Sequence, residues 1–582
     1  MRRSWRTLAL CAAMTLGLIG VRAAAADATP LAAHCDIAGV TLPVSVDYAV
    51  DDGTPVAGGA TTRATIGSSM PTLPLTVTVD TMTVEIPIPA GVAKINTVAF
   101  TGGNLSASYT VKGDSLILAF DGPQTSTDLT IPTITITETV AAGSAQAAPA
   151  WTDFSEIDAT TNAGDATCTP GTVATPPALA RPAPDPNPFY TSPAGFASKA
   201  PGTVLRTRTV AIRFLGIPVP VDATQALFRT TDSLGNAVTT VTTVLVPRTG
   251  WDTARQGPRP LVSYQIAIDD IRAQCQPSEE MQQNGEGEMA LFAPLLQAGD
   301  VVAVTDYEGP RFAYSAGVVE GQATLDGIRA AEQIPGTGLD GTRTPVAMWG
   351  YSGGAIATGW AAQLQPSYAP ELNVKAVAMG GTPADLLATA QHMNGGPFSG
   401  LMLLAVIGIT REYPYFSLAF NAAGRAMVSD LTNASCGTLG NAYQSLAPYV
   451  TVPDPLSNPL VEAVMAQTKL GGTAPTTAPI LLYHAVYDEG IPYQEAVNLR
   501  AAWCAKGANI TFQPHIETEH ASLQVFGAQG AIDFIQARFA GHTTGGNCGR
   551  TVTATPGPLT PVMQVIDALA SITTTDLGAF DL

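Results

Sequence analysis

The sequence predicts an all-β, sandwich-like N-terminal domain followed by a larger α/β domain built on a mainly parallel sheet. Three observations support this expectation. The chain has 582 residues, which is too long for one small hydrophobic core. Residues 27–169 contain many short runs rich in β-branched residues, whereas residues 185–550 alternate strand-like runs with helix-like segments. Residues 170–184, between them, are rich in proline and alanine, a composition that favours a stiff, extended linker.

The N-terminal region has the pattern of a β-sandwich. The expected strands are Val40–Val50, Leu73–Ile88, Leu105–Val111, Ser115–Phe120 and Leu129–Thr137. The region lacks a nucleophile with a base and an acid near it, and His34 is its one histidine. We therefore expect a binding or spacer role, with a cell-envelope component or a polymer as the ligand.

Strand-like and helix-like segments alternate in the second region. The expected strands are Thr240–Val246, Pro260–Ile266, Asp300–Thr305, Val346–Trp349, Val374–Met379, Ile480–Val486 and Asn509–Pro514, and the expected helices include Thr324–Gln333 and Tyr493–Ala505. This alternation predicts a mainly parallel sheet with helices on both faces. Active sites of such sheets gather at the carboxyl ends of the strands.

One stretch, Pro345–Gln365, has the layout of a strand, a tight turn and a helix. Ser352 lies at the apex of the turn, with Gly350 and Gly354 two positions away on either side. A serine on so sharp a turn needs small neighbours, because the strand and the helix pass very close together. An ordinary Gly/Ser turn gives the same short pattern, but the strand before it and the small-residue helix after it favour a nucleophile. The amide of Gly353, at the helix N-terminus, would face the oxygen of an attacked carbonyl group.

A nucleophilic serine needs a base and an acid on later strand ends, with the acid first in the chain. Asp488 follows the strand Ile480–Val486, and His520 follows the last strand, just before an apolar helix. We expect His520 to take the serine proton and Asp488 to orient the imidazole. The alternatives are less well placed: His484 and His515 belong to strands, His392 and His542 to Gly/Asn-rich loops, and Asp385, Asp430 and Asp454 follow no clear strand.

The N-terminus has the layout of a signal peptide. Basic residues at positions 2, 3 and 6 precede the apolar run Leu8–Val21 and the small residues Ala24–Ala26, which predicts cleavage after about Ala26 and an extracellular or cell-surface protein. A lipid anchor would need a cysteine at the cleavage site, whereas Cys11 lies inside the apolar run. The remaining chain has no apolar run near the roughly 18 residues that cross a bilayer, so we expect a soluble mature protein.

Charge and cysteine content narrow the function classes further. Removing residues 1–26 takes away four arginines and no acidic residue, so the net charge changes from −19 to −23. Such a charge argues against nucleic acid and polyanionic partners. Six cysteines remain in an exported chain, which suggests three disulfides, and grouping by domain favours Cys35 with Cys168, Cys275 with Cys436, and Cys504 with Cys548. The cysteines are widely spaced and contain no CxxC pair, so disulfides are favoured over a metal site. We expect no cofactor.

Residues 185–549 resemble the secretory lipase family of α/β hydrolases, the group typified by fungal lipase A. The resemblance is carried by Asn187–Tyr190, Pro201–Leu205, Leu227–Asp232, Ser263–Gln265, Thr305–Pro310, Gly350–Gly354, Gln365–Pro370 and Gly380–Pro383. It leaves the N-terminal β region unassigned. The resemblance implies a serine esterase or lipase that acts on ester or lipid substrates in lipid catabolism, with Ser352, Asp488 and His520 as its triad.

The family also implies an oxyanion hole and a helical cap. The oxyanion hole would consist of Gly353 and of an aspartate after the third strand, which looks like Asp269. The family usually has an acidic residue before that aspartate, whereas this chain has Ile268, so Asp269 and Asp270 stay as alternatives. The cap would span about 384–475. Its apolar run Gly400–Ile409 is either a buried helix or a wall for a fatty acyl chain, and residues 551–582 form either a flap, with helical spacing in Val562–Ile572, or a tail.

Two further functions are consistent with the sequence. The same acyl-enzyme could transfer its acyl group to an alcohol or a lipid, which would make the protein an acyltransferase. The protein could instead act mainly as a surface-binding module through its β domain. A transient contact with a lipid interface is the remaining partner that we consider.

Overall fold

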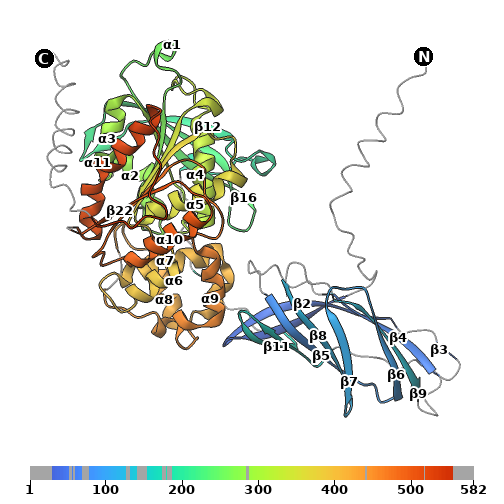
Figure 1. Cartoon of the computed structure of the whole chain (residues 1–582). Coiled ribbons are helices and arrows are strands. Elements are labelled where there is room, and N and C mark those ends of the chain that lie inside the picture. Colours follow the sequence, from blue (N-terminus) through green and yellow to red (C-terminus); the bar gives the residue numbers. More distant parts are fainter. Residues whose placement is uncertain are drawn as a thin grey trace, which may run out of the picture. The chain divides into compact units, whose positions relative to one another are not determined.

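The structure is a computed structural model that describes residues 29–51, 55–56, 59–67, 78–125, 131–140, 154–172, 179, 187–283, 287–438, 442–516 and 518–554. The expected signal peptide, most of the expected linker and residues 555–582 of the expected flap or tail lie outside the described residues. The chain divides into two compact units, with the boundary between Pro176 and Pro177 (Figure 1).

The first unit is all β. Its strands are β1 (Thr29–Ile37), β2 (Val40–Asp51), β3 (Pro55–Val56), β4 (Gly59–Gly67), β5 (Thr78–Pro87), β6 (Val92–Thr101), β7 (Ser106–Lys112), β8 (Ser115–Thr125), β9 (Thr133–Val140), β10 (Glu156–Thr161) and β11 (Gly164–Pro170). Ten of them pair in the order β6-β9-β4-β2-β1-β11-β10-β5-β8-β7, and β3 pairs with β4. Every pair is antiparallel.

The core of this unit follows from the alternation of apolar and polar residues. In β8, Leu116, Leu118 and Phe120 are buried, and each is followed by a more exposed residue. Phe100 on β6 meets Phe120 edge to face, with ring centroids 6.2 Å apart, although β6 and β8 lie near opposite ends of the strand order. The continuous sheet therefore folds back on itself, which gives the sandwich-like packing that the sequence predicts. The disulfide Cys35–Cys168 joins the neighbouring strands β1 and β11.

The second unit contains a nine-stranded sheet. Its strands are β12 (Val204–Val210), β15 (Val221–Thr231), β16 (Ala237–Pro247), β17 (Leu261–Gln265), β18 (Val301–Thr305), β19 (Val346–Tyr351), β20 (Val374–Gly380), β21 (Ile480–Ala485) and β22 (Ile510–His515), in the order β12-β15-β16-β18-β17-β19-β20-β21-β22. The strands from β18 to β22 pair in parallel, and β12, β15 and β16 add an antiparallel edge. The short strands β13 (Arg213–Phe214) and β14 (Ile217–Pro218) form a separate hairpin.

Helices cover both faces of this sheet (Figure 1). The helices are α1 (Thr253–Gln256), α2 (Pro277–Gln283), α3 (Met289–Ala298), α4 (Gly317–Ala331), α5 (Gly353–Tyr368), α10 (Tyr493–Ala505) and α11 (His520–Phe539). Residues of α4, α5 and α10 share one apolar cluster with Val346 and Met348, and residues of α3 and α11 share another with Ala347 and Trp349. Successive residues of a strand point to opposite faces, so the uniformly apolar strand β19 faces both helix layers.

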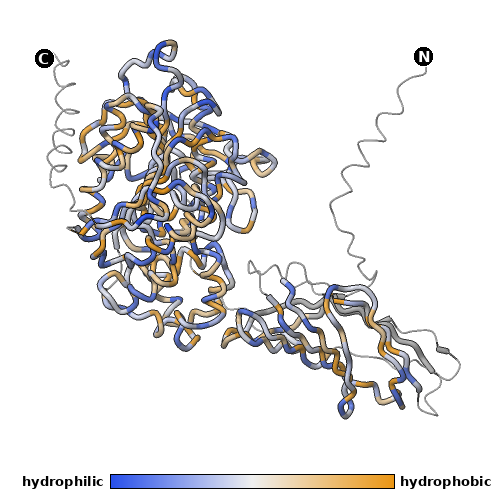
Figure 2. The backbone as a smooth tube through the Cα atoms, viewed as in Figure 1, coloured by the Kyte–Doolittle hydropathy of each residue, from blue (hydrophilic) through white to orange (hydrophobic). Residues whose placement is uncertain are grey.

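A helical cap follows β20. It comprises α6 (Leu386–Met393), α7 (Ser399–Glu412), α8 (Ala422–Thr432) and α9 (Pro459–Met465). Residues of α6, α7 and α8 share an apolar cluster around Leu404 and Ile407, whereas Met465 of α9 belongs to the cluster that α4, α5 and α10 share with the sheet. Figure 2 shows apolar segments in the cap as well as around the sheet. The described part of the chain has no helix with the length and apolar character that crossing a bilayer requires.

Candidate active site

The turn at Ser352 is as tight as the sequence predicts. Strand β19 ends at Tyr351 and α5 begins at Gly353, and Ser352 between them has φ 53° and ψ −122°, a conformation that costs an L-residue free energy. A Cβ atom on Gly350 would lie 2.4 Å from the Gly354 carbonyl oxygen, and one on Gly354 would lie 2.0 Å from the Gln265 carbonyl oxygen. Glycine is therefore required on both sides of the serine.

Three expected side chains come together at this turn. His520 Nε2 lies 2.8 Å from Ser352 Oγ, and His520 Nδ1 lies 2.7 Å from Asp488 Oδ2. An ionised carboxylate can only accept a hydrogen bond, so Nδ1 carries the proton and Nε2 is free to accept the serine hydroxyl. This arrangement can remove a proton from the serine and hold it on the imidazole.

Backbone hydrogen bonds hold the acid and the histidine in place. Asp488 follows β21, and its Oδ1 accepts from the amides of Gly490 (3.0 Å) and Ile491 (2.7 Å). His520 begins α11, where Glu519 is the N-cap in a capping box. The Tyr351 hydroxyl donates to the His520 carbonyl oxygen over 2.6 Å. The base is thus fixed through its backbone as well as its ring.

The electrostatics match the geometry. Burial lowers the pKa of His520, but the hydrogen bond and charge of Asp488 outweigh that effect, so the pKa is raised above its ordinary value of 6.5. Burial raises the pKa of Asp488, but the hydrogen bond with His520 outweighs it and holds the pKa below 3.8. The pair therefore favours an ionised carboxylate and a basic imidazole.

The structure separates the two aspartates that the sequence leaves open. Asp269 has a positive φ of 47°, lines the same cavity as Ser352 and His520, and places Oδ1 2.0 Å from the position that a Cβ on Gly353 would take. Its carboxyl group therefore lies against the first residue of α5. The amide of Gly353 is in the first turn of that helix and has no acceptor within it.

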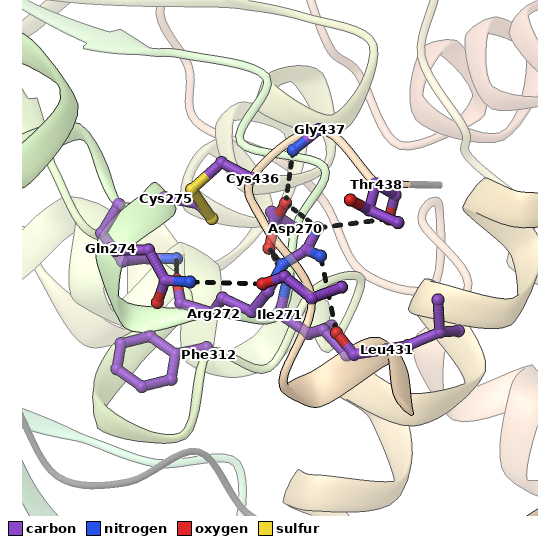
Figure 3. A network of polar contacts seen from close by, with 12 residues as sticks. Asp270, Ile271, Arg272, Gln274, Cys275, Phe312, Leu431, Cys436, Gly437 and Thr438 are labelled. Atoms are coloured by element: carbon purple, nitrogen blue, oxygen red, sulfur yellow. Dashed lines mark hydrogen bonds and ion pairs between the residues drawn. A yellow bond between two sulfur atoms is a disulfide. The ribbon is translucent and has the colours of Figure 1, made fainter. Parts of the chain in front are cut away.

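Asp270 turns away into a buried ion pair with Arg272 (Figure 3). The Arg272 guanidinium group also donates to the carbonyl oxygens of Leu431 and Thr438, and the Gly437 amide donates to Asp270 Oδ2 over 3.4 Å. The disulfide Cys275–Cys436 lies beside these contacts. Asp270 thus ties the loop after β17 to the segment after α8 and takes no part in the cavity.

Comparisons with known proteins identify the family of the chain. The profile of the family described as Secretory lipase matches residues 281–547. The probable inactive lipase MT1628 of Mycobacterium tuberculosis is 36% identical over 62% of this chain and 83% of that protein. The secreted triacylglycerol lipase LIP1 of Malassezia furfur is 36% identical over 62% of this chain and 77% of that protein. The chain belongs to the secretory lipase family.

A solved structure supports the same conclusion for the fold. The X-ray structure of Candida antarctica lipase A matches with a TM-score of 0.60 and 30% identity, covering 68% of this chain and 96% of that chain. The secretory lipase described here is therefore an α/β hydrolase of the carboxylic ester hydrolase class. Because one relative carries the name of a probable inactive lipase, catalytic competence has to be argued from the residues of this chain.

The cap of this secretory lipase covers an apolar cavity above Ser352. The cavity has a volume of about 330 Å³ and reaches Ser352, Asp269 and His520 at one end. Helix α7 contributes Leu401, Met402, Ala405, Val406 and Ile409, which recur at helical spacing and so form one face. Leu403, Leu404 and Ile407, on its other side, pack in the cap cluster. The run Gly400–Ile409 is thus both a buried helix and a cavity wall.

The competing residues lie elsewhere or have other partners. His542, Asp430 and Asp454 are exposed. Asp385 caps α6 and pairs with Lys469, and the His392 ring lies 3.0 Å from the Glu489 carbonyl oxygen. His515 ends β22.

His484 differs from these residues and is the functional candidate that sequence reasoning assigned to packing. It is fully buried in β21, but its Nε2 lies 3.4 Å from Asp488 Oδ2. The signal in the sequence was the separation of four residues between this histidine and the acid.

The remaining expected disulfide pairs are also formed. Cys504, in α10, is bonded to Cys548, and Cys275 to Cys436. Residues 551–554 of the expected flap or tail are described and belong to no helix or strand.

Proposed function

We propose that the protein is an exported serine carboxylic ester hydrolase of the triacylglycerol lipase or carboxylesterase type, which forms an acyl-enzyme on Ser352. The observation that carries the proposal is the continuous line from Ser352 Oγ to His520 Nε2 at 2.8 Å and from His520 Nδ1 to Asp488 Oδ2 at 2.7 Å. Both distances are within the reach that proton transfer from a nucleophile to its base requires.

The first half-reaction transfers the acyl group to the enzyme. Ser352 Oγ forms a bond to the ester carbonyl carbon while its proton moves to His520 Nε2, and the carbonyl oxygen becomes negatively charged. The bond between this carbon and the alcohol oxygen then breaks, and the imidazolium gives its proton to the leaving alcohol. Asp488 stabilises the imidazolium throughout.

The second half-reaction releases the acid. A water molecule gives its proton to His520 and its oxygen bonds to the acyl carbon, after which the bond to Ser352 Oγ breaks and the serine regains its proton. The negatively charged oxygen of both tetrahedral intermediates would be stabilised by the Gly353 amide and by Asp269. Their placement at the helix N-terminus beside Ser352 supports this role.

The cap supports an ester with a fatty acyl chain as the substrate. The cavity is lined mainly by apolar side chains of α6, α7 and neighbouring cap segments, and Ser352 is among its lining residues. Burial of a methylene group is worth about 0.8 kcal/mol. A chain that extends from Ser352 along α7 would therefore gain affinity with each carbon that the cavity accommodates. The relative from Malassezia furfur, which is named a secreted triacylglycerol lipase, supports the same substrate class.

Export is supported by the N-terminal sequence and by the disulfides. Residues 1–26 have the layout of a cleavable leader, and the structure contains three disulfides, which persist in oxidising compartments outside the cytosol. We expect the protein to lose this leader and act extracellularly or at the cell surface.

The test is an assay of the purified chain on p-nitrophenyl esters of graded chain length. We expect Ser352→Ala to abolish turnover and Ser367→Ala, an exposed serine at the other end of the same helix, to leave it unchanged. Intact mass after treatment with an organophosphate should show one adduct, absent from Ser352→Ala. Full activity of Ser352→Ala, or no adduct on the active enzyme, would refute the acyl-enzyme.

A further inference from the structure

The carboxylate of Asp488 faces two imidazoles. His520 Nδ1 donates to Oδ2 over 2.7 Å, and His484 Nε2 lies 3.4 Å from the same oxygen. The His484 ring also lies 3.1 Å from the Ile491 carbonyl oxygen through the same Nε2 atom. His484 therefore contacts both the acid and the end of the turn that carries it.

The two neighbours of Nε2 decide the tautomer of His484. A carbonyl oxygen and an ionised carboxylate are both acceptors, so Nε2 must carry the hydrogen and donate it to Ile491. Nδ1 is buried and has no hydrogen-bond partner among the described residues. A proton there would be a buried donor without an acceptor, so the ring stays neutral. Burial lowers the pKa of His484 in the same sense, and the charge of Asp488 only partly offsets it.

We propose that His484 is a positioning residue for the acid of the triad: its Nε2–H fixes the turn 488–491 to strand β21 and keeps Asp488 aimed at His520. This inference rests on the proposed function. The backbone ties the start of the turn to the strand, because the Asp488 amide donates to the carbonyl oxygen of Ala485, the last residue of β21, over 3.3 Å. Asp488 Oδ1 is used by the amides of Gly490 and Ile491, which belong to the turn itself. The bond from His484 adds a side-chain link from the sheet to the Ile491 end of the turn.

Titratable groups of several elements face this pair. His520 and His484 face Asp488, the Tyr493 ring lies 6.1 Å from the His484 ring between centroids, and the Tyr351 ring lies 5.3 Å from the His520 ring. His520 is also influenced by the charges of Asp269 and Glu489.

The experiment uses the full chain with His484→Leu, which removes the donor, and His484→Gln, whose amide nitrogen can replace Nε2–H. We expect His484→Leu to lower kcat by about 10- to 100-fold, by analogy with the loss of the partners that orient the ligands of metal sites. The coupling between Asp488 and His520 weakens, so the acid limb of the kcat/KM profile should move to lower pH. His484→Gln should keep the wild-type limb and most of the activity.

A matched control is His515→Leu, a buried histidine at the end of the neighbouring strand β22, which belongs neither to the turn 488–491 nor to the strand before it. His515→Leu should lower the stability of the fold about as much as His484→Leu does, without moving the acid limb of the kcat/KM profile. If His484→Leu does not fold, His484→Met, which is unbranched and adapts to the cavity, replaces it as the donor-free variant. Unchanged kcat and an unchanged limb in a folded donor-free variant would overturn the inference, as would equal losses in His484→Gln.

Failure of the positioning role of His484 can be distinguished from failure of the proposed hydrolase activity. If the wild-type protein takes up no organophosphate and hydrolyses no ester, the serine hydrolase proposal fails before His484 is tested. If the wild-type protein is active and only the His484 results disagree, the triad stands and the positioning role is refuted.

Discussion

The assignment of Asp269, rather than Asp270, to the oxyanion hole makes a quantitative prediction. Replacing Asp269 by glycine removes the carboxyl group that lies against Gly353 and leaves the backbone free to keep its φ of 47°, because glycine adopts positive φ without steric cost. Alanine at this position would add backbone strain, and its effect on kcat could not be separated from that of losing the carboxyl group. Loss of one oxyanion donor typically lowers kcat by about 10² to 10³, or 2.7 to 4 kcal/mol of transition-state stabilisation.

The chemistry of the carboxyl group refines this prediction. A carboxyl group can donate a hydrogen bond only when it is protonated. An amide donates without a proton to lose. We therefore expect Asp269→Asn to keep much more activity than Asp269→Gly.

Asp270→Asn is the matched comparison. It leaves the buried Arg272 guanidinium without its carboxylate, and breaking a buried ion pair costs about 3 to 5 kcal/mol. At roughly 2 °C per kcal/mol for a large domain, Tm should fall by roughly 6 to 10 °C, while kcat per folded molecule stays near the wild-type value. The assays are steady-state hydrolysis of a p-nitrophenyl ester and thermal unfolding. If Asp269→Gly keeps its kcat and Asp270→Asn loses it while folded, the assignment is reversed.

Three further predictions concern the base, the cavity and the turn. Asp488 raises the pKa of His520, and the reaction needs the neutral imidazole, so kcat/KM should fall at acid pH with an apparent pKa above 6.5. An apparent pKa at or below 6.5 in the pH profile would contradict the pairing of His520 with Asp488. Ala405→Trp should fill part of the cavity and shift the preference to shorter acyl chains, by about fourfold in kcat/KM for each methylene contact that is lost. Ala423→Trp, at an exposed position of α8, should leave the chain-length preference unchanged. Equal chain-length profiles of the two variants would refute the assignment of the cavity. Gly354→Ala should abolish activity and destabilise the fold by about 1 to 3 kcal/mol or more, because its Cβ would lie 2.0 Å from the Gln265 carbonyl oxygen. Gly530→Ala, at an exposed position of α11, should stabilise the fold slightly. Thermal unfolding of both variants would show the difference.

Much of the second unit follows from its sequence, because most of its parallel strands are rich in apolar residues. The prediction of Tyr493–Ala505 has the same bounds as α10, and Ile480–Val486 exceeds β21 by one residue. Strand β12 was missed because its sequence, Val204–Val210, alternates arginine and threonine at an edge where only one face is partly covered. Several strands of the first unit, including β10 and β11, were missed because they are short and rich in threonine, aspartate and glycine.

The site was harder to predict where the decision depends on tertiary structure. Asp269 and Asp270 are adjacent in sequence and chemically identical, and only the positive φ of Asp269 sends the two side chains to different partners. The run Gly400–Ile409 could not be divided into a packing face and a cavity face without knowing what surrounds α7. His484 is a similar case. A histidine within a strand is expected to be a packing residue, and only the fold of the turn after β21 brings Asp488 and Ile491 to its ring.

The cap and the catalytic turn are linked through the loop after β17. Its Asp269 contacts the first residue of α5, while the residues that follow bind the segment after α8 through Arg272 and the disulfide Cys275–Cys436. The C-terminal end of α7 is held independently, because Glu412 pairs with Arg311, which also pairs with Asp232. Helix α7 supplies a wall of the cavity that we propose for the acyl chain, and the loop carries the proposed oxyanion residue Asp269, so these two anchors hold both parts of the proposed site relative to Ser352. In the proposed reaction, such preorganisation would lower the cost of orienting the ester before attack.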